Sequence, residues 1–288
     1  MSYQTILFLI DRDSDFKGRL RVATDVARSF SAHLVGLYLV EMPEMLPSVA
    51  AALPSDIVER YVRAAHDTQR ATAQAFRDAV ESAGWNDVEW RAPSGPPIAP
   101  YVRPIDAAVA YGRCADLIVV EQPQTLDGGS LVAERLVTTV LMETGRPLLV
   151  VPYVGAPETI GTHVLVAWDG GREAARAIAD AIPLLRRARR VTVASVDPGA
   201  SARGVDALGR ERFAGYLQRH GIAAHIDYTN LGADAIPVGE WLLSRVADIG
   251  ADLIVMGGYG HARWREQVLG GVTRTLFSSM TVPVLMAH

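Results

Sequence analysis

The chain has 288 residues, of which 49% are hydrophobic and 21% charged, and its formal net charge is −4. This composition supplies packed cores for one large domain or two of ordinary size and excludes an intrinsically disordered chain. The slightly acidic balance excludes the basic footprint of a nucleic-acid-binding protein. No apolar stretch approaches the length of a membrane span, and no charged leader precedes the first apolar run. We therefore expect a cytoplasmic protein without a membrane partner.

Strand and helix patterns alternate along the first half of the chain. Short apolar runs bounded by turn residues are typical of strands buried in a parallel sheet, and apolar residues at helical spacing predict the helices between them. The predicted strands are residues 5–10, 34–40, 88–91, 116–120 and 147–152, and the predicted helices are residues 16–30, 55–83, 103–113 and 131–144. This alternation predicts a parallel sheet with helices on both faces.

The same order restarts at residue 162. The predicted strands are residues 162–169, 190–196, 224–228, 252–256 and 283–287, and the predicted helices are residues 172–187, 213–220, 236–248 and 273–277. Residues 116–120 match 252–256 at an offset of 136, and residues 146–151 match 282–287 at the same offset. This indicates an internal duplication, with a first repeat at residues 1–155 and a second at residues 156–288. The first strands align at an offset of 158 instead, so the first repeat carries an insertion, which we place at residues 42–54 and in the helix after them.

Two glycine clusters frame the strand–loop–helix unit near the end of the chain. The strand at 252–256 runs into Gly257, Gly258 and Gly260, and Gly270 and Gly271 precede the last helix. Glycine lets backbone N–H groups approach a phosphate, and a helix N-terminus adds unpaired donors and a partial positive charge. The pair of clusters therefore predicts a phosphate site. Glycines that only make turns are the alternative.

The spacing of Gly257, Gly260 and Gly270 resembles the ATP-binding signature of the universal stress protein family, Gly-x2-Gly-x9-Gly. The resemblance covers the whole chain and implies two tandem α/β domains of the Rossmann-like, adenine-nucleotide α-hydrolase-like type, each with a five-stranded parallel sheet flanked by helices. In the family, Ser or Thr follows the last glycine, whereas this chain has Gly271 there and Thr273 two residues further on. The missing hydroxyl removes one expected phosphate contact, worth about 1 kcal/mol.

The same resemblance implies where the rest of the nucleotide binds. Asp169, at the end of the first strand of the second repeat, corresponds to an aspartate that contacts the nucleotide in the family. The alternative role for Asp169 is a helix cap, which is also the role that we expect for Asp11. Ala167 is expected beside the adenine, and Val196 is expected to meet the adenine through its backbone.

Further residues complete the expected pocket. Met256 and Val272 would line it. His261, Arg263 and Arg265 are secondary candidates, because cations between the two glycine clusters would neutralise phosphate charge. Exposed loop residues are the alternative for these three.

The first repeat lacks the glycines of the second. The positions of Gly257, Gly260, Gly270 and Gly271 are occupied by Glu121, Gln124, Glu134 and Arg135. Close backbone approach is lost there, and carboxylates would repel a polyphosphate. We therefore expect nucleotide binding in the second repeat only.

The last strand of each repeat is apolar and would be an open sheet edge if it stood alone. In the family, such strands pair antiparallel between subunits. Here residues 147–151 and 283–287 can pair within one chain as a pseudo-dimer, and a further homodimer is left open.

These features predict a stress-response regulator or sensor that binds ATP or another adenine nucleotide, with Mg²⁺ carried by the phosphates. The protein partner that it would regulate is left open. The sequence has no identifiable catalytic base or nucleophile and no spacing typical of a protein-only metal site. An enzyme that hydrolyses ATP slowly and an interaction protein that binds no nucleotide are the alternatives.

Overall fold

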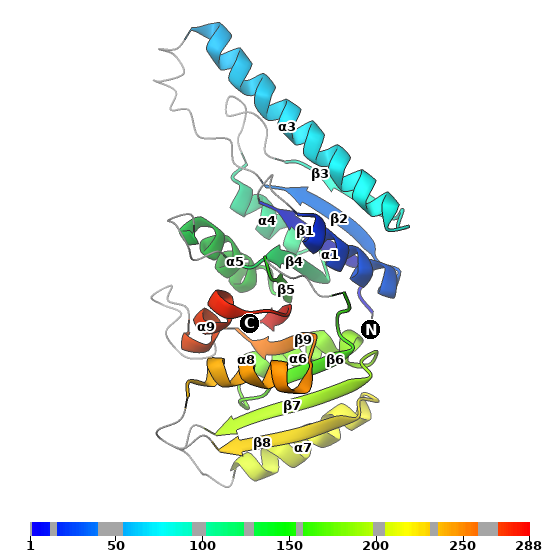
Figure 1. Ribbon diagram of the computed structural model, residues 1–288, viewed down its shortest axis with the longest axis vertical. Helices are drawn as coiled ribbons and strands as arrows, with labels where there is room; N and C mark the ends of the chain where they lie inside the picture. The colour runs from blue at the N-terminus through cyan, green and yellow to red at the C-terminus, as the bar shows by residue number, and fades with distance from the viewer. Residues whose placement is uncertain are drawn as a thin grey trace. The chain divides into compact units, whose positions relative to one another are not determined.

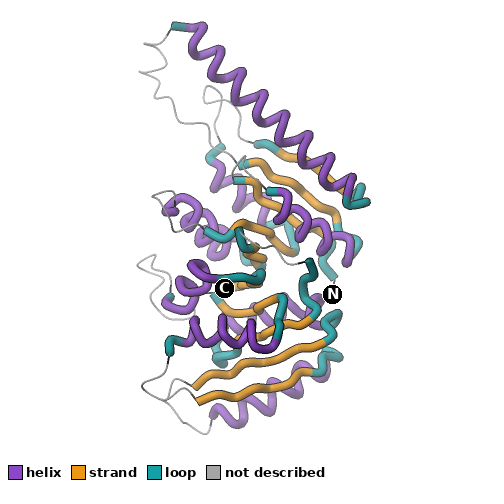
Figure 2. Tube along the Cα trace, in the orientation of Figure 1, coloured by secondary structure: helices purple, strands orange, loops and turns teal. Residues whose placement is uncertain are grey.

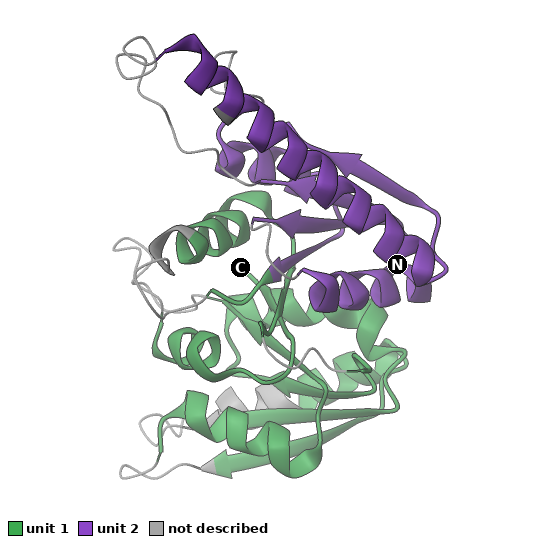
Figure 3. Cartoon of the chain, turned by 45° about the horizontal axis from the view of Figure 1, so that its top comes forward, with its two compact units in different colours: residues 1–2, 121–288 green, residues 3–120 purple. Residues whose placement is uncertain are grey.

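The computed structural model describes residues 2–11, 16–39, 54–93, 102–123, 130–153, 158–197, 205–230, 236–258 and 270–288 (Figure 1). The chain divides into two compact units (Figure 3): one comprises residues 3–120, and the other residues 1–2 and 121–288. This division differs from the predicted repeat boundary at residue 155, because the end of the first repeat clusters with the second repeat.

The unit of residues 3–120 contains a parallel sheet in the order β3-β2-β1-β4. Its elements are β1 (Thr5–Ile10), α1 (Lys17–Phe30), β2 (His33–Tyr38), α3 (Ser55–Ser82), β3 (Val88–Arg91), α4 (Pro104–Gly112) and β4 (Leu117–Glu121). The apolar residues of β1, β2 and β4 are almost completely buried, as expected for central parallel strands. The second predicted strand begins one residue earlier than expected and ends at Tyr38.

Helix α3 packs beside α1 and is the longest of the described helices of this unit (Figure 1). The C-terminal half of α3 is buried through Ala73, Phe76 and Val80. Gly36 of β2 permits this packing, since a Cβ at that position would lie 2.7 Å from the ring of Phe76. The close approach explains why a glycine interrupts the apolar run of β2.

The unit of residues 121–288 contains a sheet in the order β5-β10-β9-β6-β7-β8. Its strands are orange and its helices purple in Figure 2. Its elements are α5 (Ser130–Thr144), β5 (Leu148–Val151), β6 (His163–Ala167), α6 (Arg172–Leu185), β7 (Arg190–Asp197), α7 (Val205–Arg219), β8 (Ala224–Asn230), α8 (Val238–Ile249), β9 (Leu253–Gly257), α9 (Gly271–Ser279) and β10 (Val284–Ala287). Strands β6 to β10 are parallel to one another. This confirms the five-stranded parallel sheet predicted for the second repeat, and its strand order β8-β7-β6-β9 repeats the order β3-β2-β1-β4 of the first.

Two helices of the second repeat differ from the expectation. Helix α7 begins at Val205, well before the predicted residue 213, and α9 begins at Gly271 rather than Thr273. Gly271 can occupy the first helical position because the N–H groups of that turn need no intrahelical partner. Figure 1 shows α6 and α7 on one face of this sheet and α8 and α9 on the other, which is the arrangement that right-handed crossovers between parallel strands produce.

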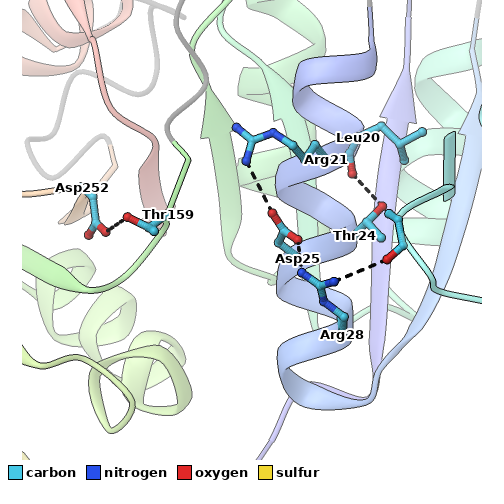
Figure 4. A network of polar contacts seen from close by, with 8 residues as sticks. Leu20, Arg21, Thr24, Asp25, Arg28, Thr159 and Asp252 are labelled. Atoms are coloured by element: carbon cyan, nitrogen blue, oxygen red, sulfur yellow. Dashed lines mark hydrogen bonds and ion pairs between the residues drawn. The ribbon is translucent and has the colours of Figure 1, made fainter.

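An aspartate before the fourth strand joins it to the first strand in both repeats. Asp116 accepts hydrogen bonds from the backbone N–H groups of Gln4 (2.7 Å) and Thr5 (3.0 Å). Its counterpart Asp252 accepts bonds from the N–H groups of residues 162 and 163 and from the hydroxyl of Thr159, each at 3.0 Å (Figure 4). The duplication detected in the sequence is therefore repeated in the hydrogen bonds.

The last strands of the two repeats pair with each other. β5 and β10 are antiparallel, with Leu149 opposite Leu285, Val150 opposite Val284 and Leu148 opposite Met286. The pairing expected between residues 147–151 and 283–287 is thus present. Among the helices that the structure describes, none is long and apolar enough to cross a membrane.

Candidate functional site

The candidate site lies at the carboxyl ends of β6, β7 and β9. Val166 of β6 pairs with Val255 of β9, so Ala167 and Met256 are the next residues at the same edge of the sheet. Ala167 also pairs with Ala194 of β7, whose strand continues to Val196 and Asp197. In open α/β sheets, ligands bind outside the carboxyl ends of adjacent strands. The sheet therefore brings together the backbone positions predicted to meet the adenine.

Helix α9 begins at the same edge. A helix that connects two parallel strands runs antiparallel to them, so the N-terminus of α9 lies toward the carboxyl end of β9. Gly270 is its N-cap and Gly271 its first residue; both are exposed, and no side chain of a described residue caps this end. A Cβ added at either glycine would meet nothing within 4 Å. The first N–H groups of α9 are thus open to an approaching anion.

Gly257 has a role in helix packing that the sequence analysis did not predict. A Cβ at this position would lie 2.5 Å from the backbone N of Ala174 and 2.7 Å from the carbonyl carbon of Glu173. The first turn of α6 therefore packs directly on the end of β9, and only glycine leaves room for it. The fold requires Gly257 independently of any ligand.

Asp169 is exposed and follows β6 by two residues. Its Oδ1 accepts a hydrogen bond of 2.8 Å from the N–H of Gly171, which is the N-cap residue of α6. No side chain of a described residue forms a capping hydrogen bond to the first turn of this helix. Asp169 therefore bonds to the N-cap residue of α6, which resembles the helix-capping role that is the alternative to nucleotide binding. Because a carboxylate has several acceptor positions, this bond leaves Asp169 able to bind a further donor.

The structure adds a buried carboxylate, Glu173, beside Gly257. Glu173 is 9% exposed, and its carboxylate receives bonds from the guanidinium of Arg172 at 2.9 and 3.0 Å. Burial opposes its ionisation, but its own backbone N–H, Arg172 and the positive charge of His288 together lower its pKa. The sequence pattern that could have identified Glu173 is its position in the first turn of a helix, directly after an Asp-Gly-Gly turn. At the edge of the sheet, this charge would disfavour an anion placed directly against it and so favours phosphates toward α9.

The remaining site residues are placed as follows. Met256 is buried at 6% exposure, Val272 is half-buried, and Thr273 is buried at 3% exposure on the inner face of α9. The hydroxyl of Thr273 is thus not presented at the open end of the helix, where the hydroxyl absent from Gly271 would have been. Gly260, His261, Arg263 and Arg265 lie outside the described residues.

An aromatic stack adjoins Asp169 and was missed by the sequence analysis. The rings of Trp168 and Phe213 are parallel, with centroids 4.2 Å apart and an interplanar angle of 3°. The backbone N–H of Trp168 donates a hydrogen bond to the carbonyl of Ala194. The stack attaches α7 to the end of β6, and its two members are too far apart in sequence for local periodicity to reveal it.

The equivalent region of the first repeat is different in structure as well as in sequence. Glu121 is the last, buried residue of β4, where β9 has Gly257. Glu134 and Arg135 lie within α5, which begins at Ser130, whereas their counterparts Gly270 and Gly271 begin α9. The N–H groups of Glu134 and Arg135 are therefore used inside a helix. Across the part of the chain that the structure describes, no group of three or more His, Cys, Asp or Glu side chains is arranged to hold a metal ion.

These features define an α/β protein of two repeated Rossmann-like domains, in which glycines end β9 and begin α9 in the second repeat. Residues 162–288 match the model of the universal stress protein family, so the second repeat is a domain of that family. A comparison with curated proteins finds no match.

Solved structures resemble the chain over nearly its whole length. A universal stress protein from Archaeoglobus fulgidus DSM 4304 has a TM-score of 0.71 at 16% identity, over 98% of this chain and 97% of that one. A putative universal stress protein from Pseudomonas aeruginosa UCBPP-PA14 has a TM-score of 0.60 at 16% identity, over 99% and 93%. At these identities the likeness shows a shared fold, and the fold includes the first repeat.

Proposed function

We propose that the second repeat binds ATP or a related adenine nucleotide and that its occupancy regulates the association of the chain with partner proteins in a stress response. The observation that carries the proposal is the exposed N-terminus of α9, formed by Gly270 and Gly271, which no side chain of a described residue caps, at the edge where β6 and β9 end. Unpaired N–H groups and the helix dipole favour phosphate oxygens there.

Each expected residue has a defined part in this proposal. The phosphates bind the first N–H groups of α9, with Gly260 and the cations His261, Arg263 and Arg265 as further candidates. The free acceptor positions of Asp169 receive a hydroxyl or amino group of the nucleoside. Ala167 and the backbone of Val196 flank the adenine, and Met256, Val272 and Thr273 form the wall behind it.

Magnesium enters this proposal through the nucleotide. Mg²⁺ is commonly held by one or two carboxylates together with substrate phosphates rather than by a dedicated protein cage. Asp169, exposed at the edge of the sheet, is the carboxylate available to it.

The nucleotide content of freshly purified protein tests the proposal. Acid release followed by chromatography should yield about one adenine nucleotide per chain, since the first repeat has Glu121, Glu134 and Arg135 where the second has Gly257, Gly270 and Gly271. Two per chain would mean that the first repeat also binds. No bound nucleotide, together with no calorimetric signal at millimolar ATP, would overturn the proposal in favour of an interaction protein.

The identity of the nucleotide needs a direct comparison. One structure similar to 52% of the chain, with 20% identity and a TM-score of 0.35, is a universal stress protein in complex with cAMP. ATP with Mg²⁺, AMP and cAMP should be titrated side by side, since each carries the adenine and the phosphate that the proposed contacts would bind. Release of many equivalents of phosphate from ATP, abolished by Asp169→Ala, would instead indicate an ATPase.

A further inference from the structure

We infer that Gln122 and Leu141, both contributed by the first repeat, are positioning residues for the nucleotide site of the second repeat. The inference rests on the proposed function. It assigns to the first repeat a role that does not require a nucleotide of its own.

Gln122 is attached to the C-terminal end of α9. It is 2% exposed and directly follows β4, where its backbone N–H donates to the carbonyl of Val151. Its side-chain Nε2 donates to the carbonyl of Phe277 at 2.6 Å, and its Oε1 accepts from the N–H of Tyr153 at 3.3 Å. Phe277 lies in the last turn of α9, where carbonyl groups have no partner within the helix. Gln122 thus supplies a hydrogen-bond donor to the C-terminal end of α9, the end opposite to Gly271.

Leu141 of α5 packs against Gly258, the residue after β9. It is 1% exposed on α5, and a Cβ added to Gly258 would lie only 2.7 Å from its Cδ2. Gly258 directly follows the end of β9, and its N–H donates to the carbonyl of Ala287 of β10. Leu141 therefore packs on the backbone directly after β9.

The two contacts are copies of one another. The repeat offset of 136 relates Gln122 to Gly258 and Leu141 to Phe277. In each, the residue after the fourth strand of one repeat meets the last helix of the other repeat. One copy is a hydrogen bond and the other is side-chain packing, so the duplication has kept the contact while its chemistry has diverged.

Together the contacts hold the described backbone on both sides of the proposed phosphate site in sequence. Gly258 directly follows β9, and Phe277 lies in the last turn of α9, the helix that begins at Gly271. Binding groups must be held to within a fraction of an ångström by the packing around them. Loosening either contact should therefore weaken nucleotide binding even though neither side chain reaches the ligand.

Gln122→Met tests the hydrogen bond, because methionine keeps the shape but removes both the donor to Phe277 and the acceptor for Tyr153. Thr144→Val is the matched control: Thr144 is also buried, and its hydroxyl donates to the carbonyl of Val140 at 2.7 Å and accepts from the N–H of Arg146 at 3.3 Å, so these hydrogen bonds do not involve α9. We expect Gln122→Met to raise the nucleotide dissociation constant about tenfold and to speed amide hydrogen exchange in α9. Thr144→Val should lower the melting temperature without changing either quantity.

A second pair of variants tests Leu141. Gly258→Ala should weaken nucleotide binding, because the new methyl group displaces Leu141, and adding Leu141→Ala should restore part of the affinity by making room. An affinity for Gln122→Met within twofold of the wild type, with no change in the exchange of α9, would overturn the inference while leaving the proposed function intact. A wild-type chain that binds no nucleotide would overturn both.

Discussion

Leu149 of β5 and Leu285 of β10 stand opposite each other in an antiparallel strand pair, and the repeat offset of 136 makes them the same residue of two copies. Their neighbours exchange places accordingly, with Val150 facing Val284 and Leu148 facing Met286. The local two-fold axis of the pairing therefore passes between Leu149 and Leu285. The pairing also satisfies two strand edges that would otherwise be templates for another chain.

Truncation of either leucine should cost nearly the same stability. Both are completely buried, so Leu149→Ala and Leu285→Ala should each lower the free energy of unfolding by about 2–5 kcal/mol. Because the residues face each other, the double variant should depart from additivity by about 0.5 kcal/mol or more. Urea unfolding of the four proteins measures this, and strictly additive effects would contradict the direct pairing.

Two glycines of the same motif should respond differently to alanine. Gly257→Ala places a methyl group against the backbone of Glu173 and Ala174, and overpacking of this kind costs about 1–3 kcal/mol. Gly271→Ala meets no atom within 4 Å and should leave stability unchanged or slightly higher, since alanine is the better helix former. Equal urea midpoints for the two variants would show that α6 does not approach Gly257 as described.

A hydroxyl at position 271 should strengthen nucleotide binding. Gly271→Ser restores the residue type that the resemblance leads us to expect after the last glycine, and one more phosphate hydrogen bond is worth about 1 kcal/mol, or roughly fivefold in affinity. Gly271→Leu should fold normally and bind less well, because its side chain stands before the open N–H groups. Calorimetric titration distinguishes them, and identical affinities would place the nucleotide elsewhere.

The two aspartates that join first and fourth strands should be equivalent in role but not in magnitude. Asp252→Ala removes the acceptor of three hydrogen bonds and should destabilise the chain by about 1–3 kcal/mol. Asp116→Ala removes two and should cost less. Thr159→Val, which removes only the hydroxyl contact of Asp252, is the control and should cost the least when all three are unfolded in urea.

His163 should make stability depend on pH. Burial of its imidazole, assisted by the positive charges of Arg190 and Arg245, lowers its pKa below the ordinary 6.5, against the opposing effects of the Ile249 backbone and Asp252. The unfolded chain then binds the proton more readily than the folded one, so stability falls as pH drops through about 6.5 and levels off below the folded-state pKa.

Replacing this histidine isolates its effect. His163→Gln keeps a hydrogen-bonding group near the Thr192 hydroxyl, which lies 3.0 Å from Nε2, but cannot titrate. The slope of unfolding free energy between pH 8 and pH 5 should be smaller in His163→Gln than in the wild type. Parallel curves for the two proteins would exclude His163 as the source.

Sequence patterns alone indicated the helices and strands, the duplication and the residues that we propose for the site. Apolar runs such as residues 5–10 and 252–256 identify buried strands because both faces of a parallel sheet are covered. The glycines at 257, 270 and 271 can be interpreted from the sequence because the close backbone approach that glycine permits is a property of the residue itself.

The folded structure shows which partners these residues contact. It showed that Gly257 makes room for α6, that Thr273 is buried, and that Glu173 brings a buried charge to the same edge. It also brought Gln122 to the carbonyl of Phe277 and Leu149 opposite Leu285. Each of these contacts joins residues far apart in the chain or depends on how a helix is seated, and the local periodicity of a sequence records which residues are apolar but not which partner each one meets.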